Sequence, residues 1–172
     1  MRKFIHLSLA VAFISLMSSC AKSYYELNPA KIMYAASTKF EDILLEYRYD
    51  VLSEKGNTKN SKKEAKHNVK LIAVRITNNT KAVISIGKNA AFYSGNSMIY
   101  PMDAMSLQNN LKQSVPSHLW YLLLSPVTLS INGSKDFPIG LIVGPAIAGG
   151  NMLVASNANK NLYTELLKYD LL

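Results

Sequence analysis

Residues 69–97 read VKLIAVRITNNTKAVISIGKNAAFYSGNS, and this stretch decides the fold class. Val69–Thr77 is apolar on both faces, which is typical of a strand near the centre of a sheet. An Asn-rich turn follows, and the β-branched segment Ala82–Ile86 predicts a second strand. Ala91–Tyr93 and Met98–Tyr100 flank a Ser-Gly-Asn-Ser turn, which predicts a further hairpin. The stretch therefore predicts an antiparallel β layer.

The segment before this stretch contains one more strand signal and a long basic connection. In Phe40–Leu52 apolar and charged residues alternate from Leu45 to Val51, which predicts a half-buried strand. Ser53–Asn68 is long for a hairpin loop, and we expect a solvated, flexible loop. An alternative is that its lysines contact an anionic surface: Lys55, Lys59, Lys62, Lys63 and Lys66.

The C-terminal half favours helices. Residues 102–113 form a moderate helix candidate, and residues 116–125 read PSHLWYLLLS, with a proline placed to start a helix. Residues 151–169 carry an apolar stripe that predicts an amphipathic helix. The expected fold class is therefore α+β, an antiparallel β layer with accessory helices.

Residues 137–159 carry no charge, and the segment is long enough for a transmembrane helix. Gly140, Gly144 and Ala148 follow at four-residue spacing, the small-residue pattern by which membrane helices pack. Prolines, a glycine pair and asparagines interrupt the same segment, so we favour a Gly-rich turn leading into the amphipathic helix. A membrane-embedded helix remains the alternative.

The first twenty residues resemble a bacterial lipoprotein signal. Arg2 and Lys3 precede an apolar run too short to span a bilayer comfortably, and small residues lead into Cys20. Cys20 is the only cysteine in the chain, so no internal disulfide can form. We expect cleavage after residue 19 and lipidation of Cys20, followed by a tether over residues 20–39.

Residues 40–172 suit one compact β-rich domain. Loss of Arg2 and Lys3 lowers the net charge from +8 to +6, which is still basic. In an exported protein such charge favours an anionic membrane or an acidic partner over nucleic acid.

The residue patterns of common active sites and cofactor sites are missing from the sequence. Gly144–Asn151 reads GPAIAGGN and lacks the lysine and hydroxyl residue of a phosphate-binding loop. His67 and His118 have no metal-ligand spacing, and no Gly-x-Ser-x-Gly elbow is present. We therefore expect a non-catalytic protein without a metal or cofactor.

Residues 69–97, together with LKQ at 111–113, YLLLSP at 121–126 and AGGNM at 148–152, resemble uncharacterised exported lipoproteins of the Bacteroidetes type. The PIGL and ELLKYDL segments share this resemblance. It implies an immunoglobulin-like β domain. In such domains later strands normally complete the sandwich, and we expect the sandwich to be incomplete in this sequence. It implies no activity.

These observations predict a cell-envelope lipoprotein anchored in membrane lipid through acylated Cys20, acting as a binding or structural module. An envelope protein is a candidate partner, and the sequence leaves the inner and outer membranes both open. The alternative is a membrane-embedded assembly component that uses residues 137–159.

Overall fold

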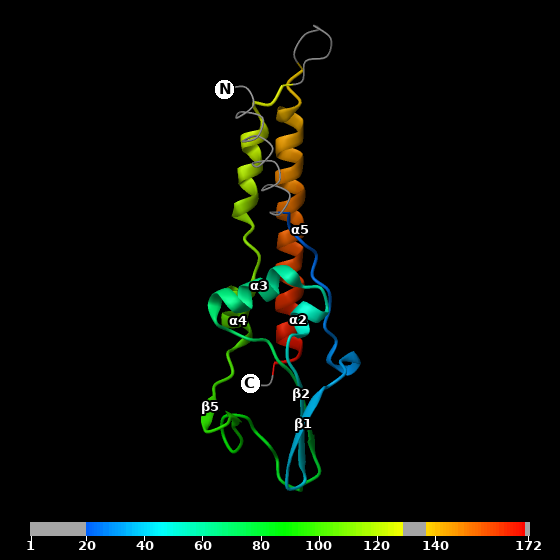
Figure 1. The fold of residues 1–172 in the computed structure, drawn as a ribbon, viewed down its shortest axis with the longest axis vertical. Helices are drawn as coiled ribbons and strands as arrows, with labels where there is room; N and C mark the ends of the chain where they lie inside the picture. The colour runs from blue at the N-terminus through cyan, green and yellow to red at the C-terminus, as the bar shows by residue number, and fades with distance from the viewer. Residues whose placement is uncertain (1–19, 129–136, 171–172) are drawn as a thin grey trace, which may run out of the picture. The chain divides into compact units, whose positions relative to one another are not determined.

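The structure, a computed structural model, describes residues 20–128 and 137–170 and has an α+β fold (Figure 1). The predicted signal, residues 1–19, lies outside the described residues. The chain divides into two compact units. Within the described residues, unit 1 comprises 20–23, 113–128 and 137–158, and unit 2 comprises 24–112 and 159–170.

Unit 2 contains all the strands and most of the short helices. In chain order these are η1 (Pro29–Lys31), β1 (Ala36–Phe40), β2 (Ile43–Arg48), α2 (Val51–Glu54), α3 (Thr58–His67), β3 (Ala73–Asn78), β4 (Phe92–Ser94), β5 (Ser97–Ile99) and α4 (Ala104–Leu111). Unit 1 contains the 3-10 helix η2 (Pro116–Leu124) and the first part of α5 (Gly140–Lys168), which continues into unit 2.

The first three strands form one antiparallel sheet in the order β1-β2-β3. The predicted alternating strand is present as β2, but it ends at Arg48. Asp50 adopts a left-handed backbone with φ 60°, and its carboxylate pairs with Lys70. The chain then enters α2 at Val51, so the prediction that the strand continues to Val51 is wrong.

Residues 69–97 are only partly as predicted. β3 begins at Ala73 and lies at the edge of the sheet, because β2 takes the central place. Residues 82–86 form no strand, since the Asn78 amide donates to the Ala82 carbonyl (2.8 Å) and closes a local turn. The second hairpin is confirmed as β4 and β5, with Gly95 at φ 59° in its turn.

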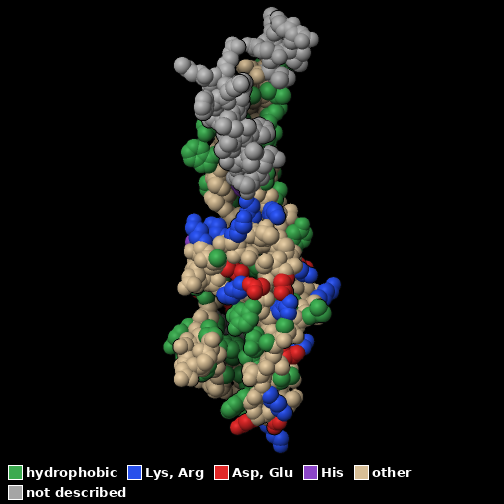
Figure 2. Space-filling model, in the orientation of Figure 1, with side chains coloured by type: hydrophobic (Ala, Val, Ile, Leu, Met, Phe, Trp, Pro, Cys, Tyr) green, Lys and Arg blue, Asp and Glu red, His purple; other side chains and the backbone are tan. Residues whose placement is uncertain are grey.

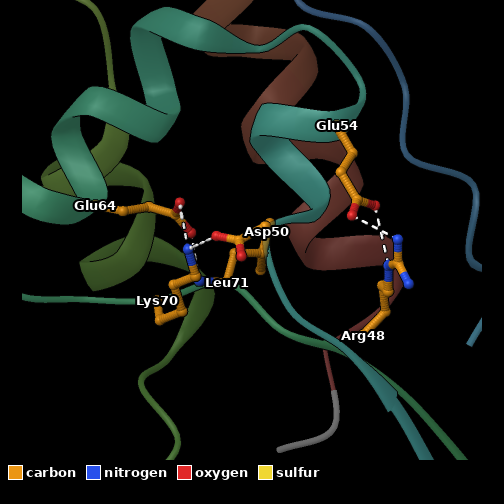
Figure 3. Close-up of polar contacts among 6 residues, drawn as sticks. All are labelled: Arg48, Asp50, Glu54, Glu64, Lys70 and Leu71. Atoms are coloured by element: carbon orange, nitrogen blue, oxygen red, sulfur yellow. Dashed lines mark hydrogen bonds and ion pairs between the residues drawn. The ribbon is translucent and has the colours of Figure 1, made fainter. Parts of the chain in front are cut away.

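The expected solvated loop at Ser53–Asn68 is wrong, because this segment contains the end of α2 and all of α3. Two polar residues of α3 are buried rather than solvated. The Asn60 amide donates to the Leu111 carbonyl (3.0 Å), and Glu64 accepts from the Leu71 amide (2.8 Å) and from Lys70 (3.3 Å). Figure 3 shows the contacts of Glu64 beside the Arg48–Glu54 ion pair.

The expected tether also proves to be folded, because Tyr24 and Leu27 are buried and residues 36–40 form β1. The Asn57 side chain accepts from the backbone N–H of Tyr25 and donates to its carbonyl, both at 2.8 Å. Glu165 of α5 accepts from the backbone N–H groups of Leu27 (2.7 Å) and Asn28 (3.1 Å). Residues 24–28 are therefore part of unit 2.

Two predicted helices correspond to α4 and η2, and the third begins earlier than expected. α5 starts at Gly140 and runs through Pro145 and the glycine pair 149–150 without a break. The predicted Gly-rich turn is therefore wrong. In unit 2 the same helix supplies Leu162, which is fully buried, as are Leu52 and Leu111.

Replacement of Asn57 with alanine is expected to destabilise unit 2. The change leaves the backbone N–H and carbonyl of Tyr25 without the amide that pairs them, at a cost of about 2–4 kcal/mol. Urea denaturation followed by circular dichroism measures this loss. Asn79→Ala is the matched control, because the Asn79 side chain is exposed. Equal losses in the two variants would contradict this role for Asn57.

Tyr24 makes the stability of unit 2 sensitive to alkaline pH. Burial, and then the nearby Glu165 carboxylate, raise the pKa of Tyr24 well above its usual 10.0. Below pH 10.0 the Tyr24 hydroxyl is protonated in both the folded and the unfolded state. Above pH 10.0 it ionises first in the unfolded state, because its pKa there is the lower one. The unfolding free energy should then fall by up to about 1.4 kcal/mol per pH unit. Denaturation at about pH 9 and about pH 11 should show a smaller loss for Tyr24→Phe than for the unsubstituted protein.

Candidate membrane-attachment site

η2 and the first part of α5 form a helical hairpin in which the two backbones approach closely (Figure 1). A Cβ atom on Gly140 would lie 2.0 Å from the Leu124 carbonyl oxygen, and one on Gly144 would lie 3.0 Å from that of Tyr121. Ala148 is buried further along the same face. The predicted small-residue face therefore packs against η2 of the same chain. That this contact lies within a bilayer stays a prediction.

The outward surface of the hairpin is apolar. Trp120 on η2 is 68% exposed, and Leu141 and Ile142 on α5 are 61% and 63% exposed. The buried side chains of the hairpin include Ala148, His118 and Tyr121, and the rings of His118 and Tyr121 stack at 6.3 Å. Several large aliphatic side chains thus face outward, whereas a water-soluble hairpin normally buries them. Hydrophobic side chains are prominent on the described part of the hairpin in Figure 2.

The exposed surface of α5 changes character along the helix. The exposed residues from Leu141 to Val154 are all non-polar, whereas those from Ser156 onward are polar apart from Leu167. Among the described residues, α5 is the one helix long and apolar enough to cross a membrane. Only 22% of the apolar 18-residue segment of α5 is buried, whereas the core helix of a soluble protein is mostly buried.

Cys20 is fixed against this hairpin. Its Sγ lies 3.8 Å from the Tyr121 hydroxyl, and the next N–H, of Ala21, donates to Asn151 Oδ1 (2.7 Å). Gln113 accepts from the Lys22 N–H (3.1 Å) and donates to the Lys22 carbonyl (2.7 Å). Three hydrogen bonds therefore hold the two residues after Cys20 to α5 and to Gln113, which precedes η2.

Asn151 explains how α5 tolerates a polar residue in its apolar part. Its Nδ2 donates to the Ile147 carbonyl (2.9 Å) one turn back, while its Oδ1 accepts from Ala21. Both ends of the amide are satisfied by protein atoms, which removes most of the cost of placing it in an apolar medium.

The five lysines of the predicted anionic contact belong to unit 2. Lys55 follows α2, and the other four lie on α3: Lys59, Lys62, Lys63 and Lys66. Glu64, the only acidic residue of α3, is buried and paired with Lys70, so it does not offset this charge at the surface. Basic side chains gather on the visible face in Figure 2. Their contact with an anionic surface stays a prediction.

Within 20–128 and 137–170, no group of three or more His, Cys, Asp or Glu side chains could hold a metal ion. His67 is exposed in the last turn of α3, and His118 is buried in the other unit.

No protein-family model, curated protein or solved structure matches this chain.

Sequence reasoning missed Gln113 and Asn151, the two amides that hold the segment after Cys20. Gln113 lies between the polar residues Lys112 and Ser114, Asn151 lies within the apolar part of α5, and no spacing marks either of them. The only signal is at Asn151, because an amide in an apolar helix needs partners.

Replacement of Gly140 with alanine is expected to separate η2 from α5. The new methyl group would meet three backbone atoms of residues 124–127 within 2.8 Å, a clash worth about 1–3 kcal/mol. Hydrogen exchange of Pro116–Leu124, measured by mass spectrometry, should become faster. Gly149→Ala adds the same methyl to the same helix with nothing within 4 Å, and should leave this exchange unchanged. Slow exchange in both variants would contradict the close contact.

Proposed function

We propose that the protein is a cell-envelope lipoprotein, attached to membrane lipid through acylated Cys20 and acting as a non-catalytic binding or structural module. The observation that carries the proposal is the position of Cys20. It follows a short apolar segment with small residues and is the only cysteine in the chain. Its thiol lies 3.8 Å from the hydroxyl of Tyr121 on η2, so acyl chains on it would start beside the apolar hairpin.

Acylation would make the attachment effectively permanent. Each buried methylene contributes about 0.8 kcal/mol, so several long chains greatly exceed the marginal binding of a single myristoyl chain. The exposed lysines of α3 would contribute about 1 kcal/mol each near an anionic surface. The acyl chains therefore anchor the protein, and the lysines affect only the orientation of unit 2.

Unit 2 is the part that would bind a partner in the envelope. Its three-stranded antiparallel sheet is compatible with one layer of an immunoglobulin-like sandwich, the finer fold that we propose from the sequence resemblance. The inner and outer membranes both fit this proposal.

A second candidate function is that of a membrane-embedded assembly component. The exposed apolar surface of α5 between Leu141 and Val154 favours it. A chain expressed from Ala21 would then need detergent to stay in solution. A monomeric, soluble product in plain buffer would contradict this candidate.

Metabolic labelling with a fatty-acid probe tests the lipid anchor. The unsubstituted protein should incorporate the probe, and Cys20→Ser should lose all labelling because no other cysteine can form the thioether. Lys22→Ala should remain labelled, since the Gln113 contacts use only the backbone of Lys22. Labelling that persists in Cys20→Ser would refute the proposal.

A further inference from the structure

We propose that the η2–α5 hairpin is immersed in the acyl chains of a membrane, so that its outward surface is a lipid-binding surface in its own right. This inference deepens the proposed function, because it places Cys20 and the hairpin in the same membrane. It also makes a claim that lipidation of Cys20 alone does not: the protein contacts lipid through its own side chains.

The first argument is the composition of the exposed surface. Between Leu141 and Val154, the exposed positions of α5 are leucine, isoleucine, valine, proline, alanine or glycine. On η2 the exposed large residues include Leu119, Trp120 and Leu123. A protein-binding site normally has an apolar centre with a polar rim, whereas this surface is apolar over the whole exposed width of both helices. Acyl chains are the partner that fits such a surface.

The second argument is charge. No Asp, Glu, Lys or Arg occurs at residues 113–128 or 137–158, the hairpin part of unit 1. Charged residues adjoin this apolar part in the sequence instead. Lys112 precedes it, and Lys160 follows it. Charges confined to the ends of an apolar segment are typical of chains in contact with lipid.

The third argument is length. Leu141 to Val154 extends for about 20 Å along α5 at a rise of about 1.5 Å per residue. One leaflet of hydrocarbon is about 15 Å thick and a complete bilayer core about 30 Å. The apolar surface is therefore deep enough to pass through one leaflet. Ala21, the residue after Cys20, donates its N–H to Asn151 of α5, near the end of this apolar part that adjoins the polar surface.

The fourth argument is the use of the small residues. Gly140 and Gly144 are occupied by η2, so the small face of α5 is unavailable for a second chain. What remains exposed are large, smooth aliphatic side chains. In this arrangement the small residues of α5 pack against η2, and the exposed side chains are apolar groups that lipid can surround.

Trp120 allows a direct test, because it is the only tryptophan in the chain and lies on this surface. The full-length protein, purified in detergent, is reconstituted in phosphatidylcholine vesicles with or without bromine on the acyl chains. Bromine quenches tryptophan only at close range. We expect brominated chains to reduce the fluorescence by about half or more, since the indole would lie among or beside them. Equal fluorescence in the two kinds of vesicle would overturn the proposal. A hairpin that binds another protein instead of lipid would give this result.

Two aspartate variants of α5 sharpen the test while the attachment at Cys20 is retained. Ile142→Asp introduces a charge within the apolar surface and should abolish most of the quenching, because aspartate strongly disfavours the bilayer core. Asn157→Asp is the control, since Asn157 is exposed on the polar part of the same helix. Quenching that is equally strong in both variants would overturn the proposal.

The two proposals can fail separately. If the unsubstituted protein incorporates no fatty-acid probe but its Trp120 is quenched, the lipid anchor is refuted and the immersed hairpin is supported. Labelling without quenching would support the anchor and refute immersion.

Discussion

The close contact between the backbones of α5 and η2 is the constraint on which unit 1 depends. Gly140 and Gly144 leave no room for large side chains between the helices, so those side chains must point outward. In water, each exposed Leu, Ile or Val forgoes about 1.5–3 kcal/mol of burial. The packing that joins the two helices thus buries Tyr121 and Ala148 but leaves several large aliphatic side chains exposed. A lipid environment would remove this penalty. The close contact between the helices therefore supports the proposal that the hairpin lies in lipid.

Unit 2 follows the opposite rule. Leu52, Leu111 and Leu162 are buried completely, and ion pairs such as Arg48–Glu54 lie at the surface. Its interior also contains buried polar side chains that pair with backbone groups, of which Asn57 is the clearest example. A small unit with short strands leaves many backbone groups without sheet partners, and buried amides supply those partners. α5 is continuous through both kinds of packing, and its exposed surface changes from apolar to polar accordingly.

The exposed apolar surface of unit 1 and the buried core of unit 2 explain what could be predicted from the sequence. The β4–β5 turn and the apolar alternation within β2 follow local patterns, so they were predicted correctly. The sequence of Ser53–Asn68 predicts a solvated loop because it shows the lysines but not the long-range partners of the buried polar residues. The turn predicted at Gly149 and Gly150 follows from helix propensities in water, which penalise glycine. If this part of α5 lies in lipid, as proposed, the need of a helix to satisfy its own backbone would outweigh propensity. The Cys20 environment needed the structure, since Gln113 and Asn151 are distant from it in sequence.

The folded state of residues 24–28 changes what the lipid anchor would do. A long tether would let the body move freely, but only three residues separate Cys20 from buried Tyr24. Since an extended residue spans at most about 3.6 Å, an acylated Cys20 would hold the start of unit 2 within about 15 Å of the lipid. The hydrogen bonds from Ala21 to Asn151 and from Lys22 to Gln113 restrict the motion of Cys20 further, because they hold the next two residues in place. Acyl chains and hairpin would then enter the membrane as one piece. A partner of such a protein must itself lie close to the membrane surface, which favours another envelope component over a freely diffusing ligand.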